Sequence, residues 1–122
     1  MPEKEPDTHG APLRRFTDPA YVPLCANLAE VRENIDRLDR QIVALLAERG
    51  RYVKDAARFK RDAFQVSAPQ RQQEVIDKVK ALAEKEGAYP EVVEAAYRAL
   101  IAGFIAREQQ DHRGMVDVEV QP

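Results

Sequence analysis

The chain has 122 residues, enough for one domain of ordinary size, and 44% of them are hydrophobic. Its formal net charge of −2 provides no basic field that would attract nucleic acid. The single cysteine, Cys25, excludes an internal disulfide and a cysteine-built metal cluster, and the two histidines lie near opposite ends of the chain, too few for a metal site.

The N-terminal region carries no signal for secretion or for a membrane. MPEKEPDTHG lacks an apolar core, and no run approaches the ~18 apolar residues of a membrane span. We therefore expect a cytoplasmic protein. Residues 1–26 contain five prolines among polar groups, which predicts a disordered or loosely packed arm.

A long amphipathic helix is predicted after this arm. Asn27 is placed to cap it, with Glu30 three residues later. Its apolar side chains then recur at spacings of three and four, a pattern typical of one helical face: Leu28, Val31, Ile35, Leu38, Ile42 and Leu45. The same spacing continues to about Lys60. We call this apolar face the seam of the helix, and a seam of this length needs a partner along its whole course.

A second helix is predicted to begin at Ser67 as its cap, with Gln70 at the capping-box position, and to end at Gly87. Pro90 opens a third helix, which extends to about Arg113.

We therefore predict an all-α fold with a helical domain over residues 27–113 and a tail over 114–122. In this tail Val116, Val118 and Val120 alternate as in a short strand. Three helices of such unequal length cannot cover every apolar face in one compact chain, which favours a dimer.

Several charged or polar side chains occupy positions where these patterns require apolar ones. Arg49 falls on the seam, and Lys60 lies about three turns, or ~16 Å, further along the same face. Glu108 continues the apolar face of the third helix, and Arg71 and Gln72 lie in the first turn of the second. Because buried charges need partners, and because cations outnumber anions in this set, a small dianion would satisfy the arrangement.

Arg32 lies beside the seam but seventeen residues before Arg49, which is ~25 Å along the axis. It cannot meet Arg49 and Lys60 around one small ligand within the same helix. It could do so from a second, antiparallel copy of the chain, which again favours a dimer.

The sequence resembles a known family in three segments. VRENIDRLDRQIVALLAERGRYVKDAARFK is similar to the first helix of the all-helical (type II) chorismate mutases, and SAPQRQQEVIDKV and AYRALIAGFIAREQQ continue the similarity to about residue 113. The resemblance implies an intertwined homodimer of three-helix chains, with the first helix very long and with two equivalent active sites. It also implies a pericyclic reaction of chorismate that needs no metal and no cofactor.

The resemblance assigns roles to individual residues. Arg32 would reach a substrate carboxylate from the partner chain, and Arg49 would bind the other carboxylate. Lys60 would donate to the ether oxygen, and Arg71 would assist at the mouth of the site. Glu108 takes the position of a second donor to that oxygen, with Gln109 as the alternative if the alignment shifts by one residue.

Some positions depart from the mutase pattern. An Asp and a Glu of the family are replaced by Ala68 and Gln72, and the interval from Lys60 to Arg71 is one residue shorter. These features resemble the isochorismate pyruvate-lyase branch. A Glu at position 108 could donate a hydrogen bond only when protonated, so we expect better activity at mildly acidic pH.

Two functional interpretations within the fold therefore stay open: chorismate mutase, and isochorismate pyruvate lyase, which forms salicylate and pyruvate. The product would serve the synthesis of aromatic amino acids or of a salicylate-derived compound. A non-catalytic helical dimerisation or regulatory module, in which Arg49 and Glu108 simply pair, is the alternative of another class. A nucleic-acid binder is disfavoured by the acidic balance, and a membrane partner is not expected.

Overall fold

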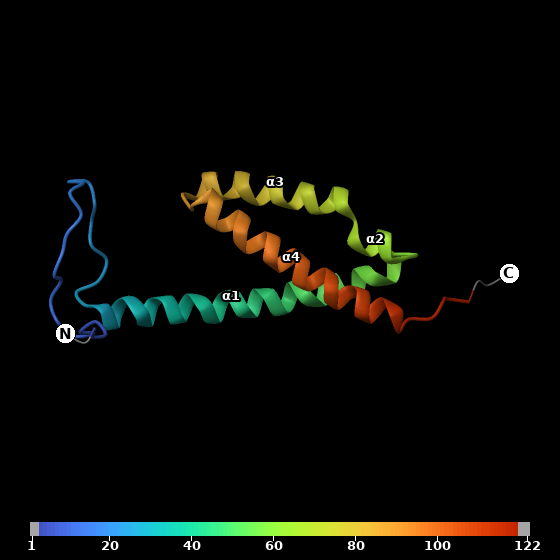
Figure 1. The fold of residues 1–122 in the computed structure, drawn as a ribbon, viewed down its shortest axis with the longest axis horizontal. Helices are drawn as coiled ribbons and strands as arrows, with labels where there is room; N and C mark the ends of the chain where they lie inside the picture. The colour runs from blue at the N-terminus through green and yellow to red at the C-terminus, as the bar shows by residue number, and fades with distance from the viewer. Residues whose placement is uncertain (1–2, 120–122) are drawn as a thin grey trace. The chain divides into compact units, whose positions relative to one another are not determined.

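The computed structural model describes residues 3–119 and is helical throughout its ordered elements (Figure 1). In chain order these are α1 (Leu28–Ala56), the 3-10 helix η1 (Ala57–Phe59), α2 (Ala63–Ser67), α3 (Pro69–Glu86) and α4 (Pro90–Arg113). No strand occurs among the described residues. Val116 and Val118 are therefore not in a strand, and Val120 lies outside the described residues. The chain divides into two compact units, with the boundary between Ala47 and Glu48 inside α1.

The first unit consists of the N-terminal segment and the larger part of α1, up to Ala47. The helix starts as predicted, because the Asn27 side chain accepts a hydrogen bond from the Glu30 N–H at 2.9 Å. The Glu30 carboxylate in turn accepts from the Ala26 N–H at 3.0 Å. The N-terminal segment is tied to the helix where the Ala29 N–H donates to the Thr8 carbonyl at 2.8 Å.

The second unit is organised around α4, which contacts η1, α2 and α3. Its core consists of small and branched apolar side chains: Ala57, Val66, Ile76, Val79, Ala83 and Ile101. The end of α1 also approaches α4 closely. A Cβ added to Gly50 would lie 3.1 Å from a ring carbon of Phe104, so the glycine allows this approach. Within the described residues no helix is long and apolar enough to cross a membrane.

The connection between the first and second predicted helices differs from our expectation. The prediction of a helix to about Lys60 was too long, since α1 ends at Ala56 and one 3-10 turn follows. Lys60 is extended, with φ −109° and ψ 133°. The short helix α2, which we did not predict, then begins after Asp62, whose side chain accepts from the Gln65 N–H at 3.0 Å.

The prediction that Ser67 caps the next helix was wrong. Ser67 is the last residue of α2, and Ala68 separates α2 from α3 in a left-handed conformation, with φ 44° and ψ 64°. Pro69, which needs no N–H partner, is the first residue of α3. The chain can therefore pass from one helix to the next across a single residue.

The remaining helix ends agree with the sequence signals. Gly87 ends α3 with φ 72°, and its N–H donates to the Glu84 carbonyl while the Ala88 N–H donates to the Ala83 carbonyl at 2.8 Å. This is the Schellman arrangement that glycine favours. Pro90 begins α4, so the two helices form a hairpin (Figure 1).

Candidate functional site

A pocket of about 420 Å³ opens inside the second unit, where all five of its helical segments or their connections contribute side chains. Its polar or charged lining residues include those singled out in the sequence: Arg49, Lys60, Arg71, Gln72 and Glu108. Apolar groups complete the wall: Val53, Ala56, Val66, Val75, Ile101, Phe104 and Ile105. The polar residues that the sequence analysis placed on the three predicted helices thus line one cavity.

The charges in this lining do not cancel. Three cationic side chains and one carboxylate face a largely apolar cavity, which leaves an excess of two positive charges in a chain whose net charge is −2. Since this excess is not neutralised within the lining itself, the cavity suits a small dianion.

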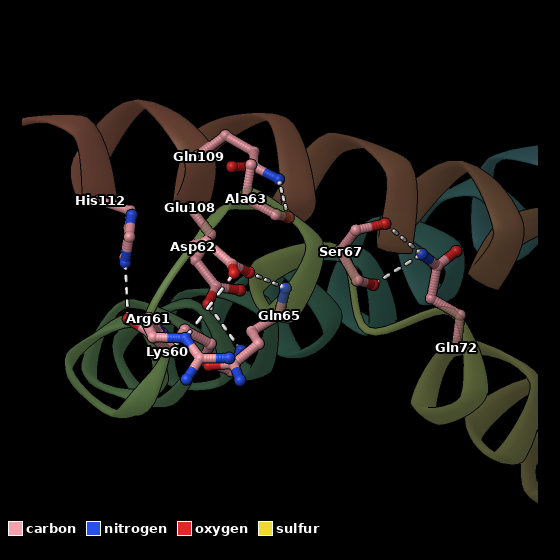
Figure 2. A network of polar contacts seen from close by, with 10 residues as sticks. All are labelled: Lys60, Arg61, Asp62, Ala63, Gln65, Ser67, Gln72, Glu108, Gln109 and His112. Atoms are coloured by element: carbon pink, nitrogen blue, oxygen red, sulfur yellow. Dashed lines mark hydrogen bonds and ion pairs between the residues drawn. The ribbon is translucent and has the colours of Figure 1, made fainter.

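Lys60 and Glu108 form the most buried polar contact in the pocket (Figure 2). Lys60 Nζ donates to Glu108 Oε2 at 2.7 Å, and the side chains are 23% and 4% exposed, respectively. In this geometry Glu108 accepts a hydrogen bond, whereas the role taken from the family requires it to donate one. An ammonium group carries three donors, so Lys60 can hold Glu108 and still donate to a bound molecule.

The structure distinguishes Glu108 from Gln109. Glu108 lines the pocket, while the Gln109 side-chain amide donates to the backbone carbonyl of Ala63 at 2.8 Å (Figure 2). Gln109 therefore fastens α4 to the start of α2. The apolar face of α4, on which Glu108 was placed from its spacing, is the face that meets the cavity.

Arg49 lies on the last turns of α1, where its guanidinium carbon stands 5.1 Å from the ring centre of Phe104 and 6.0 Å from that of Tyr97. Aromatic faces attract a guanidinium group and leave its N–H donors available at the edge. Among the described residues no carboxylate lies within ion-pair distance of Arg49. The pairing of Arg49 with Glu108, expected for a non-catalytic module, is therefore not the one observed.

Arg71 and Gln72 occupy the first turn of α3 and behave differently. Arg71 is largely exposed and lies 3.7 Å from Glu74, a surface contact that leaves it free to move. The Gln72 amide donates to the Ser67 carbonyl at 2.7 Å and contacts Ser67 Oγ at 3.3 Å. Gln72 thus satisfies the end of α2, and only its side-chain oxygen is available to a ligand.

Arg32 does not line this pocket. It is an exposed residue of α1 in the first unit. The sequence argument that Arg32 cannot meet Arg49 and Lys60 within one helix agrees with its absence from the lining, and its role across a dimer stays a prediction.

Two features of the site were missed at the sequence level. The capping pair Asp62 and Gln65 around α2 has the spacing of a capping box, a signal that could have revealed the short helix. His112 contacts the backbone of Lys60, with Nε2 2.7 Å from the carbonyl oxygen. No local sequence pattern predicts a contact between residues so far apart in the chain.

Comparison with known proteins agrees with this arrangement. Residues 31–109 match the family described as chorismate mutase type II, which covers more than half of the chain and includes every residue of the pocket. The chain belongs to the chorismate mutase type II family. The helical fold described above is consistent with this family, and the matched region begins one residue before Arg32.

Individual relatives carry two different names. The chain is 37% identical over 84 residues to an isochorismate pyruvate lyase of Pseudomonas aeruginosa. The aligned region spans 69% of this chain and 83% of that protein. It is 29% identical over 84 residues to a chorismate mutase of Methanocaldococcus jannaschii, or 68% and 85% of the two chains. A bifunctional chorismate mutase/prephenate dehydratase of Aquifex aeolicus is 31% identical over 87 residues, 68% of this chain but 24% of the longer relative.

Proposed function

We propose that the protein is a chorismate mutase that rearranges chorismate to prephenate in the pocket around Lys60. The observation that carries the proposal is the excess of two positive charges in the lining of a largely apolar cavity, because the substrate is a small dianion. The name of the relative from Methanocaldococcus jannaschii supports the same reaction.

The side chains of the pocket would act by orientation and by electrostatic stabilisation. Arg49, held over Phe104, presents a planar donor fork that suits a carboxylate. Fixing the enolpyruvyl chain over the ring removes much of the entropic cost of the rearrangement. Lys60 would donate to the ether oxygen as charge develops on it, where one such donor typically contributes ~3–4 kcal/mol.

Glu108 would serve this reaction in one of two protonation states. A protonated Glu108 would itself donate to the ether oxygen. An ionised Glu108 would hold Lys60 in place through the contact at 2.7 Å while another Lys60 proton reaches the substrate. The first role makes activity depend on the protonation of Glu108, whereas the second requires only that the side chain accepts from Lys60.

The proposal includes a homodimer. The seam of α1 is uncovered within the first unit, since Ile35 is 50%, Leu38 45% and Ile42 52% exposed. Contiguous apolar surface of this kind marks an interaction site in a water-soluble protein. An antiparallel second copy would cover the seam and would bring its Arg32 to the pocket of the first chain. We also place the enzyme in the cytoplasm, where the unpaired Cys25 would stay reduced.

A second candidate function is isochorismate pyruvate lyase. The 37% identity with the relative of that name favours it, as do Ala68 and Gln72 at positions where the mutase pattern has carboxylates. The same Lys60 would then stabilise the oxygen that leaves with pyruvate. The product would feed a salicylate-derived pathway instead of aromatic amino acid synthesis.

One experiment separates the candidates. The purified protein is offered chorismate and isochorismate separately between pH 5 and pH 8, and products are identified as prephenate or as salicylate plus pyruvate. Prephenate with little salicylate supports the mutase, and efficient salicylate formation supports the lyase. Lys60→Ala should abolish either reaction, while Lys54→Ala, at an exposed lysine of α1, should not. Turnover of neither substrate would reject both and favour the non-catalytic module.

A further inference from the structure

The backbone at Lys60 is not held by regular secondary structure. Lys60 follows the 3-10 turn η1 in an extended conformation, and its N–H donates to the Ala57 carbonyl at 3.2 Å. Its own carbonyl points out of the helical hydrogen-bond pattern and needs a donor from elsewhere. Because the carbonyl carbon is bonded to the Cα of Lys60, a contact that holds this carbonyl also holds the point from which the side chain extends.

His112 supplies that donor from the last turn of α4 (Figure 2). The distance from His112 Nε2 to the Lys60 carbonyl oxygen is 2.7 Å, in a partly buried contact between residues 52 positions apart. Because a carbonyl oxygen only accepts, Nε2 must carry a proton, whatever the charge of the ring.

His112 and Glu108 are four residues apart and so lie on the same face of α4. Glu108 accepts a hydrogen bond from Nζ of Lys60, and His112 donates one to the backbone carbonyl of Lys60. One face of one helix thus holds Lys60 at both ends. Since α4 is also the central helix of the unit, the ammonium group is fixed relative to the pocket and not only relative to its own loop.

We propose that His112 is a positioning residue for Lys60. His112 is not among the residues that line the pocket, and its side chain hydrogen-bonds to the Lys60 carbonyl. The inference rests on the proposed function in that Lys60 is the donor to the reacting oxygen. Removing the His112 donor releases the backbone end of Lys60, which displaces Nζ while Arg49 and the cavity stay in place.

The test uses the full-length protein with His112→Ala, with His112→Gln, which keeps a side-chain donor, and with His112→Phe, which keeps a ring and loses the donor. Gln110→Ala, an exposed neighbour on α4, is the matched control. The kcat and KM are measured with whichever substrate the unmodified protein converts. Independently, reductive methylation of Lys60 is followed by mass spectrometry, with the exposed Lys78 as internal reference.

We expect His112→Ala and His112→Phe to lower kcat about tenfold with KM changed less than about twofold, since a displacement of ~1 Å at the reacting centre has effects of this order or more. Methylation of Lys60 should accelerate several-fold relative to Lys78. His112→Gln should restore most of both properties, and Gln110→Ala should change neither.

Unchanged kcat and unchanged Lys60 reactivity in folded His112→Phe would overturn the proposal. A loss of stability without rescue by His112→Gln would also overturn it, because it would reveal a purely structural role. If the protein converts neither substrate, the proposed function fails, but the reactivity of Lys60 still decides whether His112 positions it.

Discussion

Lys60 and Glu108, separated by 48 residues in sequence, meet with Nζ 2.7 Å from Oε2, and the carboxylate is buried more deeply than the ammonium. Both residues line the pocket. The energy of this pair therefore depends on both partners, because a buried charge left without its counter-ion is costly.

Glu108→Ala should lower the free energy of unfolding by about 3 kcal/mol, since it leaves Lys60 without its partner in a partly buried site. Glu108→Gln should cost less, because the amide can still accept from Lys60. Urea unfolding followed by circular dichroism measures both values. Glu84→Ala, at an exposed position of α3, provides the control and should change stability by less than about 0.5 kcal/mol.

The pH profile of Glu108→Gln distinguishes the two roles of Glu108. If a protonated Glu108 donates to the ether oxygen, activity of the unmodified protein rises as the pH falls from 8 to 5, and the variant, with a permanent donor, loses this dependence. Steady-state kcat measured at each pH tests this. Identical profiles for the two proteins would instead support the role in which Glu108 only holds Lys60.

Mixing two inactive variants tests whether Arg32 acts across a dimer. In a mixed dimer of Arg32→Ala and Lys60→Ala chains, one pocket has its own Lys60 and an intact Arg32 from the partner. After unfolding and refolding together, about a quarter of the unmodified activity should return, because half of the dimers are mixed and each has one complete site. No recovery, with mixed dimers demonstrated by mass spectrometry, would show that Arg32 acts within its own chain or not at all.

Ala68→Gly should stabilise the protein. Ala68 has φ 44°, in the left-handed region that costs a residue with a Cβ about 1 kcal/mol more than glycine. We expect the free energy of unfolding to rise by up to about 1 kcal/mol. Ala81→Gly, at an exposed position inside α3, should have the opposite effect of similar size. A destabilised Ala68→Gly would contradict the assigned backbone conformation.

Glu94 links α3 to α4 and gives stability a measurable pH dependence. Arg98 and then Lys80, which lies 3.1 Å from its carboxylate, lower the pKa of Glu94 below its ordinary value of about 4.5. Ionised Glu94 therefore stabilises the folded state when the pH is above the ordinary pKa. This contribution is lost as the pH falls through the lowered pKa of the folded state. The melting temperature of Glu94→Gln should therefore lie below that of the unmodified protein at pH 7 and approach it as the pH falls through the lowered pKa. A constant difference across this range would contradict the linkage.

The sequence predicted the long helical elements because their signals are local. Gly87 and Pro90 mark the end of α3 and the start of α4 through conformational preferences that operate within a few residues. It did not predict α2, since five residues are too few to show a helical period. Ser67 was misassigned because a polar residue before Pro69 has the pattern of a helix start, whereas here it ends the preceding helix.

The candidate site divides in the same way. Arg49 and Glu108 could be found because each interrupts an apolar face, and Lys60 was found from its spacing to Arg49 in a helix that was predicted too long. The structure places all three at one pocket. The partners that they choose were not predictable. Arg49 lies against Phe104 and Lys60 pairs with Glu108, a choice that depends on how α4 packs against the connection after α1.

The contacts of α4 with the Lys60 connection have a consequence for which sequence changes this family member can tolerate. Glu108, Gln109 and His112 each contact a different atom of residues 60–63, and all three depend on one rotational setting of the helix. A single-residue insertion between Gly103 and Glu108 would rotate the following part of α4 by about 100° and detach all three together. Length variation should therefore be tolerated in the turn around Gly87 but not in the second half of α4.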